Sequence, residues 1–163
     1  MNKVLVSIGL VICIIVASLC SSGTTTEISY TPRNEHVGCD TYAHKVFCLS
    51  NDYRVNEGLP RLIWNSELEK VSKARVDDMC KNNYFAHETK EYDWTREINS
   101  SLFDYTLAGE NLAKGHKTPD EATKALIASP SHRENIVGRY TYSGVYTADC
   151  NGRILTAQTF AKP

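Results

Sequence analysis

The chain has 163 residues, which is the length of one domain. Hydrophobic residues make up 42% of it and charged residues 23%, so it can form a hydrophobic core and is not intrinsically disordered. The 18 Lys and Arg nearly balance the 19 Asp and Glu, for a formal net charge of -1. This balance excludes a nucleic-acid-binding protein that is held by its overall positive charge, and it excludes an acidic tail.

The first 23 residues have the pattern of a secretory signal peptide. Lys3 is their only charged residue, an apolar run extends from Val4 to Leu19, and small residues follow up to Gly23. The run is slightly shorter than the about 20 residues that cross a bilayer, and no basic cluster follows it, which disfavours a membrane anchor. Lipid anchoring through Cys20 is disfavoured as well, because Leu19 is bulky where such a cleavage site needs a small residue.

Three regions are therefore expected. Residues 1–23 are the signal peptide, residues 24–38 are a flexible leader, and residues 39–163 form a single domain. The leader is polar, contains a proline and shows no periodicity. We predict a secreted, extracellular monomer without a membrane span in the mature chain.

Four cysteines remain outside the signal peptide: Cys39, Cys48, Cys80 and Cys150. An even number of cysteines in an exported chain implies two disulfides. No C-x-x-C spacing occurs, so a zinc ribbon or a thioredoxin-type site is disfavoured. Sequence alone allows three pairings, among which we favour Cys39–Cys48 with Cys80–Cys150. From loop-closure entropy, the short loop would add at most about 2.7 kcal/mol to the free energy of unfolding, and the long loop at most about 4.4 kcal/mol.

Helical spacing predicts a first helix from about Tyr42 to Glu57, ended by Gly58. The apolar stripe of this helix consists of Val46, Leu49 and Tyr53. A second helix begins at Ser66, which forms a capping box with Glu69. The expected inner face of this second helix is Leu68, Val71, Ala74 and Met79.

A third helix begins at Thr118, where a capping box with Glu121 is joined to Pro119 at the first helical position. It ends at Ser129-Pro130, because the residue before proline leaves the helical region. The apolar residues of this helix are Ala122, Ala125 and Leu126. A further short turn starts at a capping box of Ser131 with Glu134 and ends at Gly138.

After Gly138 the hydrophobic period changes to two. Asn151-Gly152 between two alternating runs is a strong β-hairpin signal. Helices followed by a terminal hairpin indicate an α+β domain with an antiparallel sheet.

The stretch between His87 and Glu110 has no helical period but is rich in aromatic residues. Long loops of this kind usually form lids or binding loops, so we predict ligand-binding roles for Tyr92, Trp94, Phe103 and Tyr105. The alternative is that Trp94 and Phe103 only pack the loop against the domain. Asn99-Ser100-Ser101 is a glycosylation sequon, which has meaning only in a eukaryotic source.

The local motifs of serine hydrolases, nucleotide-binding proteins and zincins are absent from the chain. The candidates for chemistry are His87, Glu110 and His132, which are polar residues within otherwise apolar segments. Their spacing does not match a local metal site, and the alternative is that each is a hydrogen-bonded structural group. As catalytic candidates, Glu110 would act as a base and a histidine as an acid.

Several short motifs occur together in one order. They are Asn51–Arg54, Gly58–Pro60 with Leu62 and Trp64, Tyr84–His87, Gly109–Ala113, Ser129–Ile136 and Gln158–Ala161. From about Leu49 to Pro163 the chain resembles the CAP domain, also called the SCP domain, in its compact bacterial-type version. The family includes cysteine-rich secretory proteins, antigen five and plant pathogenesis-related proteins. The resemblance implies an α-β-α sandwich with a central antiparallel sheet.

The resemblance also implies a central cleft where two His and two Glu bind a divalent cation such as zinc. His87, His132 and Glu110 match three of these positions, whereas the second Glu position falls on Ser129 and the usual Trp before it is Leu126. This departure removes one anionic ligand, which weakens the affinity for a cation. The carboxylates of Glu121 and Glu134 are near in sequence and could take the place of the missing ligand. We expect instead that the position stays vacant.

These observations favour a binding or interaction module over an enzyme. Its cleft and aromatic segment would hold an extended or lipidic extracellular ligand, such as a lipid, a sterol or a peptide, with or without a cation. The alternative is a metal-assisted, peptidase-like hydrolase that uses His87, His132 and Glu110. In a third class, a structural or antigenic exported protein, the same three residues form a packed polar network.

Overall fold

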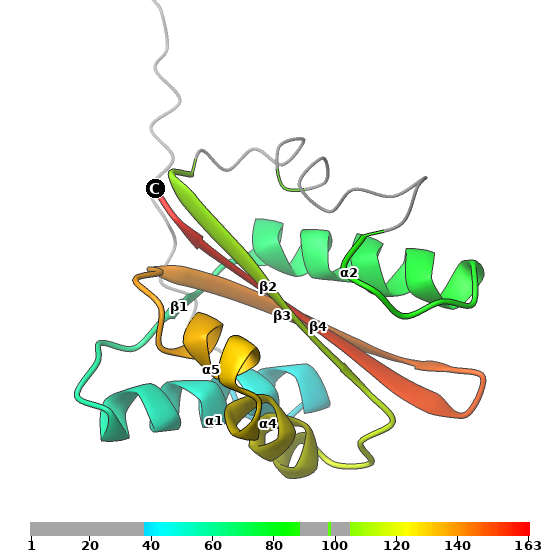
Figure 1. Ribbon diagram of the computed structural model, residues 1–163, viewed down its shortest axis with the longest axis horizontal. Coiled ribbons are helices and arrows are strands. Elements are labelled where there is room, and N and C mark those ends of the chain that lie inside the picture. The colour runs from blue at the N-terminus through cyan, green and yellow to red at the C-terminus, as the bar shows by residue number, and fades with distance from the viewer. Residues whose placement is uncertain (1–37, 89–97, 99–104) are drawn as a thin grey trace, which may run out of the picture. The chain divides into compact units, whose positions relative to one another are not determined.

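A computed structural model describes residues 38–88, 98 and 105–163, and the structural statements below concern these residues (Figure 1). The predicted signal peptide, the leader up to residue 37, the sequon at Asn99, and Tyr92, Trp94 and Phe103 lie outside them. The elements of the domain, in chain order, are α1 (Tyr42–Asn56), β1 (Ile63–Trp64), α2 (Ser66–Lys81), β2 (Leu107–Lys114), α4 (Pro119–Ala128), α5 (Pro130–Ile136), β3 (Tyr142–Cys150) and β4 (Arg153–Lys162).

The four strands form one sheet in the order β1-β3-β4-β2. β4 is antiparallel to both of its neighbours, β3 and β2, and the two-residue β1 runs parallel to β3. Helices cover both faces: α1 and α4 pack on one face and α2 on the other (Figure 1). The predicted α+β sandwich is confirmed, and β2 is an edge strand whose outer side faces α5.

Strand alternation divides the core into two layers. Leu112 of β2 belongs to the cluster that contains Val76 and Met79 of α2, whereas its neighbour Ala113 belongs to the cluster that contains Val46 of α1, on the opposite face. This alternation follows from the period of two in a strand. Because the even-numbered residues of β2 face α2, Glu110 lies on the same face as Leu112.

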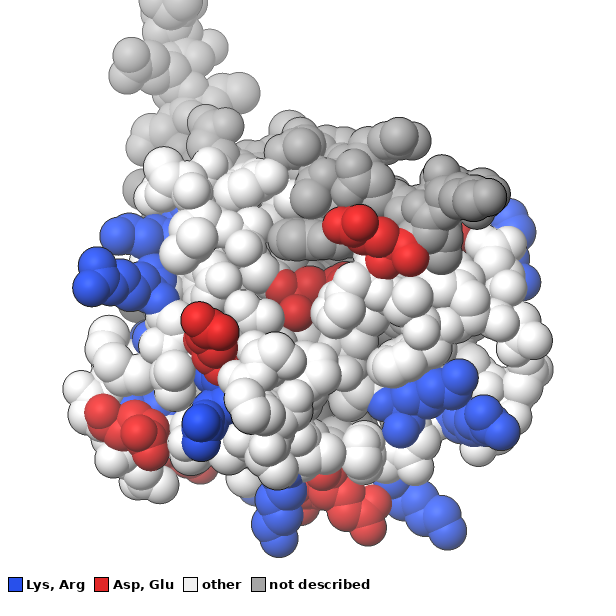
Figure 2. Space-filling model, viewed as in Figure 1, with Lys and Arg blue, Asp and Glu red and all other residues white. Residues whose placement is uncertain are grey.

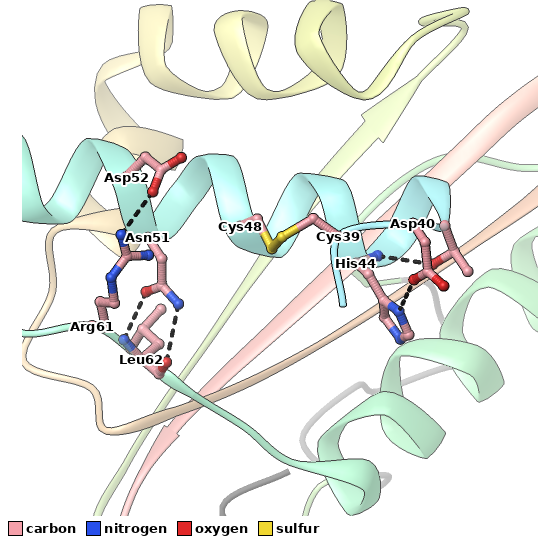
Figure 3. Close-up of a disulfide and its surroundings, with 9 residues drawn as sticks. Cys39, Asp40, His44, Cys48, Asn51, Asp52, Arg61 and Leu62 are labelled. Atoms are coloured by element: carbon pink, nitrogen blue, oxygen red, sulfur yellow. Dashed lines mark hydrogen bonds and ion pairs between the residues drawn. A yellow bond between two sulfur atoms is a disulfide. The ribbon is translucent and has the colours of Figure 1, made fainter. Parts of the chain in front are cut away.

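The predicted inner faces of the helices are only partly correct. Val46, Leu68, Val71, Met79, Ala122 and Leu126 are buried, but Leu49, Tyr53, Ala74 and Ala125 are only half-buried. In α1 the inner positions beside Val46 are Phe47, Ser50, Asn51 and Arg54. Asn51 and Arg54 are buried because their side chains bond to backbone groups: Asn51 bonds both the N–H and the carbonyl of Leu62 (Figure 3). The burial of such polar residues cannot be predicted from the pattern of hydrophobic residues.

Two of the three predicted capping boxes are wrong. The N-cap of α2 is Asn65, whose Oδ1 accepts from the backbone N–H of Leu68 at 3.0 Å, so the Ser66–Glu69 box does not begin this helix. In α5 the Pro130 ring occupies the first helical turn, the N-cap is Ser129, and no side chain caps the helix, so the Ser131–Glu134 box is absent. The Thr118–Glu121 box is confirmed, with both of its reciprocal bonds present.

The hairpin and both disulfides are confirmed. Asn151 and Gly152 have φ values of 56° and 77°, and they connect β3 to β4 in a tight turn of the kind that Asn-Gly favours. Cys39 pairs with Cys48 beside the start of α1 (Figure 3), and Cys80 at the end of α2 pairs with Cys150 at the end of β3.

Candidate functional site

Glu110 lies at the centre of the candidate site, on the edge strand β2. Its side chain is 3% exposed, and both carboxylate oxygens have partners. Oε2 accepts from Nε of Arg75 at 3.1 Å, and Oε1 is 2.8 Å from Nδ1 of His87. A buried carboxylate needs such partners, because burial without them is costly for an ionised group.

Arg75 of α2 holds several parts of the site in place at once. Its side chain is fully buried, and its guanidinium donates to the Tyr84 hydroxyl at 2.7 Å and to the carbonyl oxygen of Ala86 as well as to Glu110. Tyr84 in turn donates to Asp78. Burial and the bond to Asp78 raise the pKa of Tyr84 to about 12, so that the hydroxyl stays protonated. Arg75 therefore fixes both Glu110 and the segment that leads into His87.

His87 is the exposed member of the site. Its side chain is 49% exposed, in contrast to Glu110 beneath it. A carboxylate partner accepts a hydrogen bond from an imidazole, so the contact with Glu110 places the proton on Nδ1 and leaves Nε2 as the free ring nitrogen. The ring is therefore held in one orientation and offers an acceptor that is not used by Glu110.

His132 approaches from α5, on the other side of the edge strand. Its ring centroid lies 6.3 Å from that of His87, and the two planes are inclined by 36°. Burial, and to a smaller extent the neighbouring His87, lowers the pKa of His132, so the neutral form of His132 predominates at neutral pH. Two imidazoles thus lie next to each other over β2.

Asparagine side chains attach α5 to the edge of β2. Asn135 donates to the carbonyl oxygen of Glu110 at 3.0 Å and to Oδ1 of Asn111 at 2.9 Å. Asn111 donates to the carbonyl oxygen of His132 at 2.9 Å. The hydroxyl of Tyr140 donates to the carbonyl oxygen of Ala108, two residues before Glu110. These bonds satisfy carbonyl groups of an edge strand, and they set the position of His132 relative to Glu110.

The predicted convergence of His87, Glu110 and His132 is therefore present in the geometry. The donor set does not fit a divalent cation in this arrangement: within residues 38–88, 98 and 105–163, no group of three or more His, Cys, Asp or Glu is placed to hold a metal ion. Glu110 is already neutralised by Arg75, and Glu121 bonds to the backbone of the α4 capping box. Metal binding by the three residues stays a prediction, and a cation would have to compete with Arg75 for the carboxylate.

Sequence reasoning missed the groups that hold the site together, namely Arg75, Tyr84, Asn111 and Asn135. One signal for Arg75 was available: it lies seven residues after Leu68 and four before Met79, on the inner stripe of α2. A charged residue at such a position indicates a buried partner. The other three lie within the motifs Tyr84–His87, Gly109–Ala113 and Ser129–Ile136, which carried the family resemblance but gave these side chains no role.

Of the four aromatic residues predicted to bind a ligand, only Tyr105 is described. It is half-buried and packs beside the cluster that contains Leu68, Val71 and Tyr142. Ile98, in the same segment, is fully buried in that cluster. In the described ranges, no helix is both long and apolar enough to cross a membrane.

Known proteins were compared with the chain by sequence and by structure. The uncharacterized protein YkwD of Bacillus subtilis is 36% identical over 140 residues, which are 85% of this chain and 54% of YkwD. An extracellular SCP-domain protein of Bacillus anthracis superposes with a TM-score of 0.69 at 27% identity, over 75% of this chain and 40% of that one. An outer surface protein of Borrelia burgdorferi gives a TM-score of 0.68 at 21% identity, over 77% and 96% of the two chains, and supports the fold alone.

The chain thus spans about half of the length of YkwD. The profile of the Cysteine-rich secretory protein family, the CAP family, matches residues 49–160, which include Glu110 with both histidines and most of the described domain. This chain belongs to the CAP family.

Proposed function

We propose that this CAP domain is a secreted binding module, and that the site around His87, Glu110 and His132 receives the polar group of an extended or lipidic ligand. The observation that carries the proposal is the contrast within the site. A half-exposed imidazole of fixed orientation lies over a buried, charge-balanced Glu110–Arg75 pair. Such a site offers hydrogen-bonding groups to a ligand without an unpaired buried charge.

The two histidines suit the binding of a polar group. The His87 side chain is half-exposed, and the ring centroid of His132 lies 6.3 Å from that of His87, so one ligand group can contact both rings. The apolar part of the ligand would contact the aromatic segment, with Tyr92, Trp94, Phe103 and Tyr105 as the proposed residues. Burial of apolar area supplies about 25 cal/mol per Å² to such binding, before ordering costs.

Binding is tested with a fluorescent fatty acid and a fluorescent sterol as probes. Trp94→Ala combined with Phe103→Ala should abolish binding and leave the melting temperature nearly unchanged. His87→Ala combined with His132→Ala should weaken binding. His116→Ala is the control, because the bond from Tyr42 that the structure gives His116 goes to its backbone carbonyl and would survive the change. A large fall in melting temperature with binding intact would show that the aromatic residues belong to the core.

A second function is supported by the distance of 2.8 Å between His87 Nδ1 and Glu110 Oε1. A carboxylate that orients an imidazole is the arrangement of a general base, in which the free Nε2 takes a proton from water. The purified protein, with zinc or with a chelator, should then cleave a panel of peptides and esters, and His87→Ala should be inactive. Equal activity in that variant would indicate a contaminant and exclude this function.

The part played by a cation is tested separately, by melting the protein with and without zinc. A bound cation stabilises by RT ln(1 + [L]/Kd), which is about 2.7 kcal/mol at a hundredfold excess over Kd. If His87, Glu110 and His132 are ligands, zinc raises the melting temperature of the wild type and not that of His87→Ala. An unchanged wild type contradicts the metal role, and it leaves binding of the lipid probes as an independent question.

A further inference from the structure

A cavity of about 340 Å³ lies on the α2 side of the sheet, and His87, Glu110 and His132 are not among the described residues that line it, although Tyr84 is. It is open to solvent and is bordered by the C-terminal end of α2, the end of β2 and the β3–β4 turn, through the exposed residues Asn83, Lys114 and Asn151. Its volume is within the range of pockets that hold small molecules. What this cavity could bind is therefore a separate question from the ligand of the site around Glu110.

Two cationic side chains face this cavity from neighbouring strands. Lys114 lies two residues after Leu112 on β2, and Arg153 lies two residues before Leu155 on β4; both apolar residues pack against α2. Because residues two apart in a strand share a face, both cations are directed to the same side of the sheet as the cavity. Figure 2 shows Lys and Arg side chains gathered over the region where the β3–β4 hairpin and the end of β2 lie in Figure 1.

In the part of the chain that the structure describes, neither of these two cations is paired with a carboxylate. No acidic residue is among the described residues that line the cavity, and neither Lys114 nor Arg153 forms an ion pair with a described carboxylate. The carboxylates nearest in sequence to the lining have other partners: Asp78 accepts from Tyr84 and Asn82, and Asp149 accepts from the backbone N–H of Gly152. Among the described residues, the wall of the cavity thus holds two cations and no anion, and Lys114 also lies over the ring of Phe85 at 5.4 Å from the ring centroid.

The rest of the wall adds neutral donors and an apolar floor. Asn83 and Asn151 line the cavity, and their amide groups are further hydrogen-bond donors for an oxyanion. Met79, Leu155 and the disulfide Cys80–Cys150 supply the apolar part. A ligand that matches this wall has one oxyanion group beside a compact apolar portion.

We infer that this cavity binds a small organic anion, whose phosphate or carboxylate group contacts Lys114 and Arg153 and whose apolar portion contacts Met79, Leu155 and the Cys80–Cys150 disulfide. The inference does not rest on the function proposed for His87, Glu110 and His132. It can fail while that function holds, and the reverse is also true.

The test measures binding of phenyl phosphate, benzoate and the neutral benzamide to the oxidised protein by titration calorimetry at low salt. Either anion, or both, should bind saturably, and benzamide should not. Lys114→Gln combined with Arg153→Gln should weaken anion binding by about tenfold or more, because two charge-assisted contacts are lost. The matched control combines Lys117→Gln with Lys124→Gln, which removes the same charge from exposed positions outside the cavity and should change the affinity by less than about twofold.

Amide chemical shifts locate the bound anion. The shifts that change on titration should belong to the backbone N–H groups of Asn83, Lys114, Asn151 and Arg153. Failure of both anions to bind the wild type, equal losses in the two double variants, or shifts confined to other parts of the domain would each overturn the inference.

Discussion

Arg75 and Glu110 form the buried ion pair beneath the candidate site, with side-chain exposures of 0% and 3%. Arg75→Met would leave the carboxylate buried without its counter-ion, and we expect a loss of about 3–5 kcal/mol in the free energy of unfolding. The double variant with Glu110→Gln removes both charges and should recover part of that loss. Urea unfolding measures each value.

A matched control is available in Arg61, whose ion pair with Asp52 is exposed at both partners (Figure 3). Arg61→Met should cost less than about 1 kcal/mol, since exposed pairs contribute little. If Arg75→Met were no more destabilising than Arg61→Met, the role of Arg75 as the residue that positions Glu110 and His87 would be wrong.

His132 should make stability depend on pH. Burial, and to a smaller extent the neighbouring His87, lowers its pKa in the folded protein, below the ordinary value of 6.5. The unfolded chain therefore binds more protons as the pH falls below about 6.5, and the folded state loses stability over the interval down to the lowered pKa. Above pH 6.5 His132 is neutral in both states, and this loss of stability is absent. His132→Asn should remove this part of the acid dependence, as measured by urea unfolding at a series of pH values from 7.5 to 5; an unchanged slope would contradict the shift.

At the scale of elements, α2 lies directly on β3 at Gly144. A Cβ at this position would overlap the backbone of Leu68 and Glu69, and the carbonyl oxygen of Gly144 accepts from the hydroxyl of Ser72 at 2.9 Å. Gly144→Ala should therefore push α2 away from the sheet and cost about 1–3 kcal/mol. Gly38→Ala is the control, since its Cβ would meet only ordinary contacts and should change stability by less than about 0.5 kcal/mol. Thermal unfolding of both variants measures the difference. Equal melting temperatures would show that α2 can shift away from the sheet without a loss of stability.

Local signals predicted the helices and the terminal hairpin but not β1 or β2, and they misplaced a helix cap where two neighbours could serve equally. Thr118 and Asn151-Gly152 have chemistry that suits one structure, so the α4 cap and the hairpin could be predicted. Asn65 and Ser66 can both cap a helix, and only the folded geometry places Asn65 at the start of α2. The connection from Arg75 to Glu110 spans 35 residues, and no local pattern encodes such a contact. The convergence of His87, Glu110 and His132 was expected from family resemblance, not from spacing.

At the scale of the whole domain, the two disulfides restrain the unfolded chain to different extents. Cys80–Cys150 joins α2 to the end of β3 across 70 residues, whereas Cys39–Cys48 closes a loop of only 9. In the chain-entropy model the stabilisation grows with the logarithm of loop length, to about 4.4 kcal/mol for the long loop and about 2.7 kcal/mol for the short one as upper values.

Removal of each disulfide by paired Cys→Ala changes separates these contributions. We expect the Cys80/Cys150 variant to lose more stability than the Cys39/Cys48 variant, by about 1–2 kcal/mol, as measured by urea unfolding under oxidising conditions. We expect this order from loop length, because both disulfides adjoin a hydrophobic cluster: Cys48 packs on the α1 side of the sheet, and Cys80 and Cys150 pack on the α2 side. The reverse order would show that enthalpic contacts, such as the packing of Cys48 against the cluster around Val46 and Trp64, outweigh the entropy of loop closure.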